Sequence, residues 1–356
     1  MKILFAAETL YPPIGGADIS IRTLLDKLSE KNDVTAVYFG KKFNAKFKTL
    51  PVNIKKFRGS WINAYMNYIK WKKIIKKTID EINPDVIITQ EFFTAATVEA
   101  AENRKVIAFV RNNNFSNIHG YEFSQPGKDL GFFNKMGWKF RLQYPFYKYI
   151  QKRYLKALKK CQVLSVSHFI QNELKKYNIE SQVIRPFIDM KDYKTNKGKS
   201  ILYVGPSKAK GMAIFIKILE KMPERNFIVV GNIPDDMKKY DNVQVMPWQS
   251  DMKRIYKKAR ILLVPSVFPD PCPRVVMEAG ISGIPSLVSS RGGLPEEVEK
   301  IQIIENLDNA DEWVKKIKML DNNQLYNQLS KKAIKKAEEF SFEKQYKKLN
   351  SFFNKR

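Results

Sequence analysis

Two carboxylates in the stretch "FPDPCPRVVMEAG", residues 268–280, are spaced as a pair that could bind one ligand. Asp270 lies in a proline-rich segment after an apolar run, and Glu278 lies eight positions later in a segment with a helical pattern. A carboxylate offers two acceptor oxygens, which suit the vicinal hydroxyls of a sugar. A buried glutamate also needs a hydrogen-bonding partner. The alternative interpretation is an ordinary loop aspartate followed by a surface glutamate.

Three loops that follow other apolar runs contain glycines and lysines suited to phosphate binding. Glycine lets backbone amides approach a ligand without a Cβ in the way, and amides at a helix start favour an anion. A lysine in such a loop can form an ion pair with a phosphate. We also expect Asp18 to cap the helix that follows the first of these loops. Each loop by itself is also consistent with a plain turn. The candidate residues are Gly15, Gly16, Gly205, Lys208, Lys210, Gly292 and Gly293.

Short apolar runs of strand length alternate with longer amphipathic segments, which is typical of parallel sheets covered by helices on both faces. Such sheets bind ligands at the carboxyl ends of their strands, which is where the loops described above occur. The expected strands are 2–8, 34–39, 85–90, 105–110, 162–167, 201–205, 227–231, 243–247, 261–265 and 285–289.

The chain has 356 residues, which exceeds one ordinary core and suits two domains. A polar segment at 192–200 interrupts the alternation of strands and helices, which then restarts. We therefore predict an α/β fold of two doubly wound domains of similar size. One domain is expected over 1–185 and the other over 186–339, with the connection near residues 186–199.

The formal net charge is +27 and the pI is near 9.8, which favours an anionic partner. The alternative is a lysine-rich composition without a functional cause. The sequence contains no zinc-finger, helix-turn-helix or RNA-recognition pattern, so we do not expect nucleic acid as the partner; the charge nevertheless leaves a basic nucleic-acid-binding protein as an alternative function. Two cysteines, Cys161 and Cys272, indicate neither a disulfide framework nor a thiolate zinc site. This cysteine usage fits a reducing cytoplasmic setting, so we expect a cytoplasmic protein. No apolar run approaches the roughly 18–20 residues that span a bilayer, and the first segment is interpreted as a buried strand rather than a signal peptide.

The longest joint pattern runs from Val204 to Val298 and resembles the retaining glycosyltransferases of family 4. The family pattern has an acid, then seven residues, then Glu-Ala, which correspond here to Asp270 and Glu278-Ala279. A Gly-x-Pro segment and a Gly-Gly-x-Pro-Glu segment follow, here "SGIPSLVSS" and "GGLPE". The segments "YPPIGGAD" and "FSFEKQYKKL" also match. The resemblance covers nearly the whole chain and implies the GT-B fold. In that fold two Rossmann-like domains face each other across a cleft, and the C-terminal helix, here 340–356, packs back on the first domain.

The resemblance implies a nucleotide-sugar-dependent hexosyltransferase whose donor is held mainly by the second domain. Glu278 would accept hydrogen bonds from the ribose hydroxyls, Asp270 would contact hydroxyls of the transferred sugar, and Lys210 would neutralise the diphosphate. The further residues implied at the donor site are Gly15, Gly16, Gly205, Lys208, Arg274, Gly292 and Gly293.

The implied reaction needs no catalytic metal or other cofactor, so Asp235-Asp236 is interpreted as a plain loop. The new bond forms on the face of the sugar that the diphosphate leaves, and the leaving diphosphate helps to deprotonate the acceptor hydroxyl. The protein then contributes by positioning the reactants and stabilising charge.

Three positions depart from the family pattern. Asp270 stands where glutamate is usual. Pro206 stands where an arginine is common, so Lys208 or Arg185 would supply that diphosphate cation. The segment "RNNN", residues 111–114, replaces a common histidine. The acceptor-side candidates are Arg111, Asn112 and His119. These departures leave a catalytically inactive GT-B scaffold as the alternative function.

Two segments of the first domain, 61–77 and 132–160, interleave aromatic residues with lysine and arginine. Such segments can lie on anionic lipid. The alternative is a helix pair with an apolar core side and a lysine-rich solvent side. The first interpretation predicts peripheral attachment to the inner face of the cell membrane. It also predicts an acceptor that is lipid-linked or part of an envelope polysaccharide.

Overall fold

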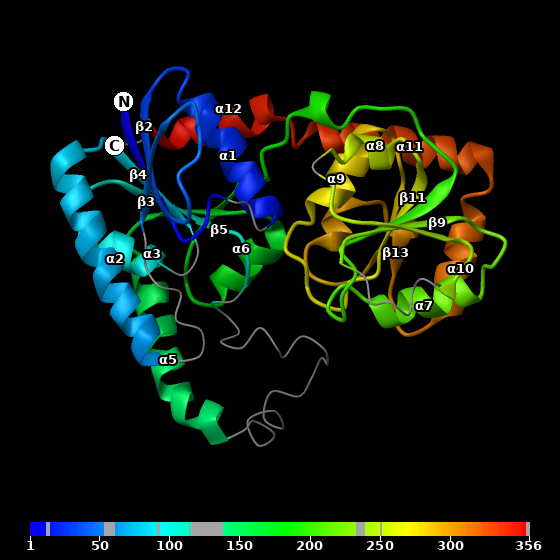
Figure 1. Ribbon diagram of the computed structural model, residues 1–356, viewed down its shortest axis with the longest axis horizontal. Helices are drawn as coiled ribbons and strands as arrows, with labels where there is room; N and C mark the ends of the chain where they lie inside the picture. The colour runs from blue at the N-terminus through cyan, green and yellow to red at the C-terminus, as the bar shows by residue number, and fades with distance from the viewer. Residues whose placement is uncertain are drawn as a thin grey trace. The chain divides into compact units, whose positions relative to one another are not determined.

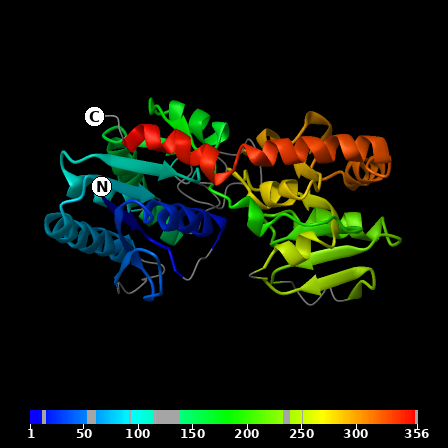
Figure 2. The same cartoon turned by 90° about the horizontal axis from the view of Figure 1, so that it is seen from above.

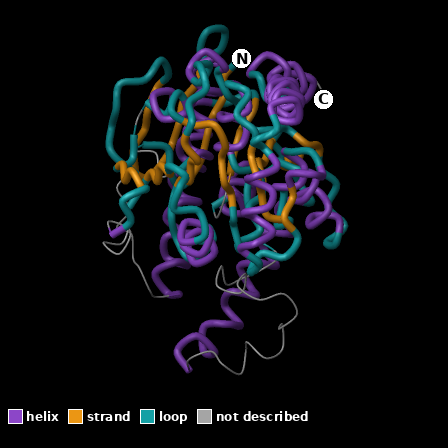
Figure 3. The backbone as a smooth tube through the Cα atoms, turned by 90° about the vertical axis from the view of Figure 1, so that its right-hand side faces the viewer, coloured by secondary structure: helices purple, strands orange, loops and turns teal. Residues whose placement is uncertain are grey.

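The computed structural model describes residues 1–11, 15–52, 61–90, 93–113, 115, 138–232, 239–249 and 251–353. Contacts divide the chain into two units, Met1–Phe187 with Gln345–Arg356, and Ile188–Lys344. Each unit contains one parallel sheet with helices around it (Figure 1), and Figure 3 distinguishes the helices, strands and loops by colour. The predicted α/β class with two parallel sheets is therefore confirmed.

The first unit is built on a seven-stranded parallel sheet with the order β3-β2-β1-β4-β5-β6-β7. Its central strands are nearly continuous apolar runs because helices exclude water from both faces; in β1 only the first residue is exposed. The strands are β1 (Lys2–Ala7), β2 (Asp33–Phe39), β3 (Lys48–Val52), β4 (Val86–Gln90), β5 (Val106–Val110), β6 (Gln162–Ser165) and β7 (Gln182–Val183). The helices include α1 (Gly16–Leu28), α2 (Trp61–Ile82), α3 (Thr94–Ala101), α5 (Trp138–Leu158), α6 (His168–Lys175) and most of α12 (Phe342–Phe353).

The C-terminal helix α12 is hydrogen-bonded to the first unit. Gln345 Oε1 accepts from Arg185 N at 2.8 Å, and Phe353 O accepts from Lys105 Nζ at 3.1 Å. Gln345 and Leu349 are both buried, so this face of the helix is covered by protein.

The second unit is built on a six-stranded parallel sheet with the order β10-β9-β8-β11-β12-β13. The chain adds β9 and β10 on one side of β8, and then returns to place β11 on the other side. The direction of winding therefore reverses between β8 and β11, and a crevice for ligands forms outside the carboxyl ends at such a point. The strands are β8 (Ser200–Val204), β9 (Phe227–Val230), β10 (Val243–Met246), β11 (Ala259–Val264), β12 (Ser286–Ser289) and β13 (Ile303–Ile304).

Helices cover both faces of this second sheet because successive side chains of each strand point to opposite faces. In β8, Ile201 and Tyr203 pack in a core with α7 (Met212–Glu220) and α10 (Ala310–Met319). Leu202 packs in the opposite core with α8 (Lys253–Tyr256) and α9 (Arg274–Ile281). Figure 1 shows these two helix pairs on opposite sides of the strands. The long helix α11 (Asn323–Glu338) runs on the side of the unit away from β9 and β10 (Figure 2).

Besides the two-residue strand β7, two short strands, β3 and β13, are absent from the strands expected from the sequence. β3 has only one exposed residue, but the other four are half-buried, and it contains Pro51. Proline cannot donate to a ladder and is tolerated at an edge, which is where β3 lies. β13 has two residues and pairs with β12 through Val288 and Ser289. Neither segment has the long apolar run that identified the buried strands.

Candidate active site

Three loops at the carboxyl ends of β8, β11 and β12 are bonded to one another in the second unit. Val267 N and Phe268 N, after β11, donate to Ala209 O, after β8, at 3.0 and 2.9 Å. Gly293 N, after β12, donates to Asp270 O at 2.8 Å. The structure therefore brings the lysine loop, the proline-rich acid loop and the second glycine pair to one place, beside the reversal of the sheet.

Two glycines allow these loops to approach so closely. Gly292 has φ +62°, and a Cβ there would lie 2.5 Å from Asp270 O. Gly211 has φ +80°, and a Cβ there would lie 1.8 Å from Pro265 O. Both glycines adopt a left-handed backbone that other residues rarely take, and both leave no room for a side chain.

The side chains of Lys210 and Asp270 form an ion pair between Lys210 Nζ and Asp270 Oδ2. The carboxylate is largely covered, whereas the lysine side chain is 37% exposed. Tyr203 OH donates to Lys210 O at 3.0 Å and so fixes the lysine backbone. The arrangement places a cation within reach of an incoming anion, with a carboxylate that neutralises it until the anion arrives.

Glu278 on α9 is buried and bonded through both carboxylate oxygens. Tyr256 OH donates to Oε2 at 2.8 Å, and Arg274 Nε donates to Oε1 at 3.0 Å. Arg274 also donates through Nη2 to Tyr193 OH at 3.1 Å. These four side chains form a polar cluster, defined here as the Glu278 cluster. Each carboxylate oxygen has a second lone pair, so Glu278 keeps the capacity to accept from a hydroxyl.

Burial and the Glu278 carboxylate control the protonation of this cluster. Burial first, and then the negative charge of Glu278, raise the pKa of Tyr256 well above 10. The same two causes raise the pKa of Tyr193 to about 12. Burial acts to lower the pKa of Arg274, but Glu278 and Tyr193 outweigh it and the pKa is raised. Both hydroxyls therefore stay protonated near neutral pH, and Arg274 stays charged.

Other donor-site candidates of the second unit lie in the same loops. Gly205 has φ +73° and begins the loop after β8. Lys208 is exposed, and no ion-pair partner for it occurs among the described residues. Arg274 was expected at the donor, and the structure shows its guanidinium committed to the Glu278 cluster.

The candidates of the first unit are located at the ends of its own strands. Gly15 is the residue before α1, with an extended backbone and no heavy atom within 4 Å of where a Cβ would be. Gly16 is the first residue of α1. The expectation that Asp18 caps this helix is wrong, because the cap has no side-chain bond and Asp18 Oδ1 instead accepts from Thr9 Oγ1 at 2.9 Å.

The acceptor-side candidates follow β5. Arg111 is buried, and its guanidinium carbon lies 5.1 Å from the centre of the Phe109 ring. Asn112 is half-buried. Arg185 belongs to the first unit, whereas Lys208 belongs to the second. His119 and the Asp235-Asp236 pair lie outside the described residues.

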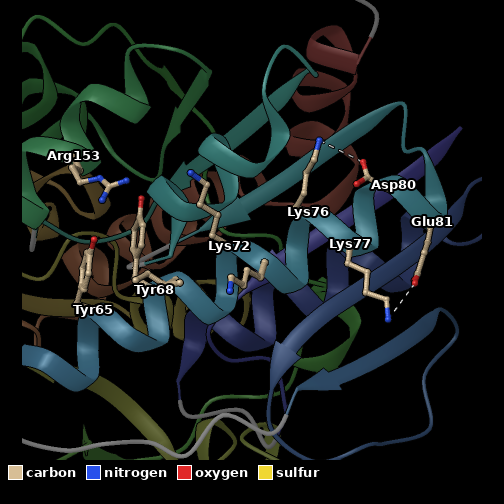
Figure 4. A pocket seen from close by; sticks show the side chains of 10 residues that line it. Tyr65, Tyr68, Lys72, Lys76, Lys77, Asp80, Glu81 and Arg153 are labelled. Carbon is tan, nitrogen blue, oxygen red and sulfur yellow. Dashed lines mark ion pairs between the residues drawn. The ribbon is translucent and has the colours of Figure 1, made fainter.

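A hollow with a volume of about 850 Å³ lies elsewhere, along α2 in the first unit (Figure 4). Its lining residues lie in the two basic-aromatic segments, 61–77 and 132–160, except for Asp80 and Glu81, which follow the first segment. Glu99 pairs with Lys72 at 3.0 Å and with Arg153 at 2.5 Å, and the Arg153 guanidinium carbon lies 4.6 Å from the Tyr68 ring centre. Several of its cations are thus already neutralised. The lining residues are Tyr65, Tyr68, Ile69, Lys72, Lys73, Lys76, Lys77, Asp80, Glu81 and Arg153.

Sequence reasoning missed Tyr193 and Tyr256. A tyrosine within an apolar pattern usually belongs to a core, and Tyr256 is indeed fully buried. Only the buried Glu278 indicated that a donor must lie nearby. Within the described ranges, no three His, Cys, Asp or Glu side chains are grouped as a metal site requires. None of the described helices is long and apolar enough to cross a membrane.

Comparisons with known proteins cover both units. Residues 14–192 match the family model of Glycosyltransferase Family 4, and residues 198–323 match the model of Glycosyl transferases group 1. In sequence, the chain is 26% identical over 184 residues to spore coat protein SA of Bacillus subtilis (strain 168). That match covers 44% of this chain and 49% of the relative, so the chain matches about half the length of that protein.

Two solved structures are similar over the whole chain. Sucrose-phosphate synthase from Thermosynechococcus elongatus has a TM-score of 0.79 at 12% identity, covering 99% of this chain and 98% of that one. HepE from Anabaena in complex with UDP has a TM-score of 0.74 at 14% identity, covering 99% of each chain. At these identities the likeness shows a common fold.

Proposed function

Since the chain belongs to glycosyltransferase family 4 and has the two-domain α/β GT-B fold, we propose that it transfers a sugar from a nucleotide-sugar donor to a hydroxyl acceptor. The observation that carries the proposal is the meeting of the Lys210–Asp270 pair with the second glycine turn at the reversal of the second sheet. A cation, a sugar-binding carboxylate and backbone amides are what a diphosphate-linked sugar requires.

In this proposal, the ammonium group of Lys210 leaves Asp270 and pairs with the donor diphosphate. The exchange leaves neither group without a partner, because the diphosphate pairs with the lysine while hydroxyls of the sugar donate to the carboxylate. Asp270 is then released to accept hydrogen bonds from hydroxyls of the transferred sugar. Amides near Gly292 and Gly293, other than Gly293 N, which is bonded to Asp270 O, add donors at the sugar or the phosphate.

Glu278 is proposed to accept hydrogen bonds from the ribose hydroxyls. Tyr256 and Arg274 hold its carboxylate in one orientation, so that binding a ribose requires no ordering of the glutamate side chain. The bond between the sugar and the diphosphate breaks, and the acceptor oxygen bonds to the same carbon from the same face. The acceptor proton passes to the leaving diphosphate, so the proposed reaction proceeds with retention and without a metal or other cofactor.

The acceptor is proposed to be a lipid-linked glycan or an envelope polysaccharide. Support comes from the net charge of +27 and from the groove along α2, whose lining includes Tyr65, Lys73 and Lys77. Cationic and aromatic side chains together favour an anionic lipid surface. We accordingly propose a cytoplasmic protein attached to the inner face of the membrane. Sedimentation should rise with the anionic lipid content of vesicles and fall with salt; indifference to both would refute the attachment.

The function is tested by a panel of UDP-, GDP- and ADP-linked sugars. A donor at 100 times its dissociation constant should stabilise the protein by about 2.7 kcal/mol, which a thermal-shift assay detects. The donor found in this way should then be turned over with retained anomeric configuration, which NMR of the product reports. An inverted product would refute the proposed mechanism. Tight binding without turnover, across an acceptor panel, would instead identify an inactive member, the alternative that Pro206 raises.

A further inference from the structure

The first segment of the second unit, residues 188–195, is bonded to both ends of α9. Tyr193 OH accepts from Arg274 Nη2 at 3.1 Å, and Arg274 is the first residue of this helix. Tyr193 O accepts from Ser282 Oγ at 2.7 Å, and Thr195 N donates to the same Oγ at 2.9 Å. Ser282 is the residue that caps the C-terminus of α9. The segment therefore holds this helix at its start and at its end.

The ring of Tyr193 packs beside the other tyrosine of the Glu278 cluster. Its centroid lies 6.3 Å from that of the Tyr256 ring, in an edge-to-face arrangement. Aromatic rings attract each other in this arrangement because the positive edge of one faces the negative face of the other. The Tyr193 side chain is half-buried against the core that contains α8 and α9. Its hydroxyl is therefore held in place by the backbone bond to Ser282 and by the contacts of the ring.

The guanidinium of Arg274 divides its donors between two acceptors. Nε donates to Glu278 Oε1 at 3.0 Å, whereas Nη2 donates to Tyr193 OH. An arginine and a carboxylate frequently pair through two parallel bonds, and such a pair occupies both carboxylate oxygens. In this cluster the hydroxyl of Tyr193 takes the place of the second oxygen. Glu278 therefore keeps lone pairs that can accept from a ligand.

We propose that Tyr193 is a positioning residue for the ribose of the donor, an inference that rests on the proposed function. Tyr193 acts through Arg274, because its hydroxyl fixes the plane of the guanidinium. The guanidinium then presents one donor rather than two to the Glu278 carboxylate. Without the hydroxyl, Arg274 can turn and form the pair with two bonds, which competes with the ribose hydroxyls for the same oxygens.

The inference predicts a loss of affinity that depends on the ribose hydroxyls. The test compares wild type with Tyr193→Phe in calorimetric titrations with UDP, GDP and ADP, and with the dideoxyribose analogue of whichever binds best. Tyr193→Phe should bind that nucleoside diphosphate at least about tenfold more weakly, as expected for the loss of one hydrogen bond to a charged group. The analogue lacks both ribose hydroxyls, so its affinity should change less than about twofold.

Tyr326→Phe is the matched control, since it also removes one bonded tyrosine hydroxyl from the second unit. Tyr326 OH donates to Arg260 O at 2.9 Å, and Tyr326 belongs to the core on the opposite face of the sheet from the Glu278 cluster. This variant should bind the nucleoside diphosphate and its analogue as wild type does. Binding of the analogue also verifies that Tyr193→Phe is folded.

The outcomes separate the inference from the proposed function. Equal weakening of both ligands in Tyr193→Phe would show a structural role alone, and unchanged affinity for both would show no role; either result refutes the inference and leaves the proposed function intact. Equal affinities of wild type for the nucleoside diphosphate and its analogue would refute the ribose contact of Glu278, and the inference with it. Absence of binding of any nucleotide or nucleotide sugar to wild type would refute the proposed function itself.

Discussion

Removing Arg274 should separate the structural role of the Glu278 cluster from its role in donor binding. Arg274→Met keeps most of the side-chain volume but leaves the carboxylate of Glu278 buried with only Tyr256 as its bonded partner. The side chains of both members of the ion pair are less than a tenth exposed, so water cannot replace the lost guanidinium. Breaking such a pair from one side costs about 3–5 kcal/mol.

This cost translates into a large thermal shift. For a domain of about 150 residues, 1 kcal/mol lowers the melting temperature by roughly 2–4 °C, so Arg274→Met should lower it by about 6–20 °C. The double variant Arg274→Met/Glu278→Leu removes both charges and should recover a substantial part of that loss, because an apolar pair often replaces a buried ion pair without penalty. The double variant should nevertheless lack donor affinity.

Scanning calorimetry of wild type, the single variant and the double variant checks this reasoning. Lys221→Met is the control, since Lys221 forms an exposed ion pair with Asp311 in the same unit and should shift the melting temperature by less than about 2 °C. A melting temperature of Arg274→Met within 2 °C of wild type would show that the pair is not buried as described. Full donor affinity in a folded double variant would remove Glu278 from the donor site.

Three further predictions concern stability and reactivity. Gly292→Ala should destabilise the protein by more than about 1–2 kcal/mol in urea unfolding, because the left-handed backbone and Asp270 O both oppose a Cβ. Gly15→Ala is the control and should be near neutral, because Gly15 has an extended backbone and open space around its Cβ position. Equal effects of the two substitutions would contradict the account. Burial, and then the charge of Glu278, raise the pKa of Tyr193 to about 12 and that of Tyr256 well above 10. The protonated hydroxyls therefore contribute their full stabilisation of the folded state below pH 10, and this contribution is lost as the pH rises above 10. The urea midpoint should accordingly fall between pH 9 and pH 11, and it should fall less in Tyr256→Phe. Desolvation raises the pKa of the half-buried Cys161 thiol to about 12, so Cys161 should react slowly with iodoacetamide at pH 8 in the native protein and faster in urea. Native labelling as fast as labelling in urea would contradict the raised pKa.

Much of the second unit could be predicted because its buried strands are continuous apolar runs. The runs around Ile201 and Leu262 located β8 and β11, and the loops after them then had to share one edge of a parallel sheet. The pairing of Lys210 with Asp270 follows from that placement, although the two residues are 60 positions apart.

Other contacts depend on packing that no local pattern contains. Tyr256 reaches Glu278 because α8 and α9 share one face of the sheet, and its apolar neighbours made it resemble a core residue. Asp18 has the residue type of a helix cap, but Thr9, at the end of a neighbouring segment, competes for its carboxylate. β3 and β13 form because they pair with the neighbouring strands β2 and β12, not because their own composition favours a strand.

Calorimetric titration of the best nucleotide sugar from the donor panel tests the central claim most directly. The account predicts that wild type binds one donor per chain, and that Lys210→Met binds it at least about tenfold more weakly while remaining folded at the temperature of the titration. The exposed lysine control, Lys221→Met, should bind as wild type does. Unchanged affinity in Lys210→Met, or no affinity in wild type, would contradict the claim that these loops hold a nucleotide-sugar diphosphate.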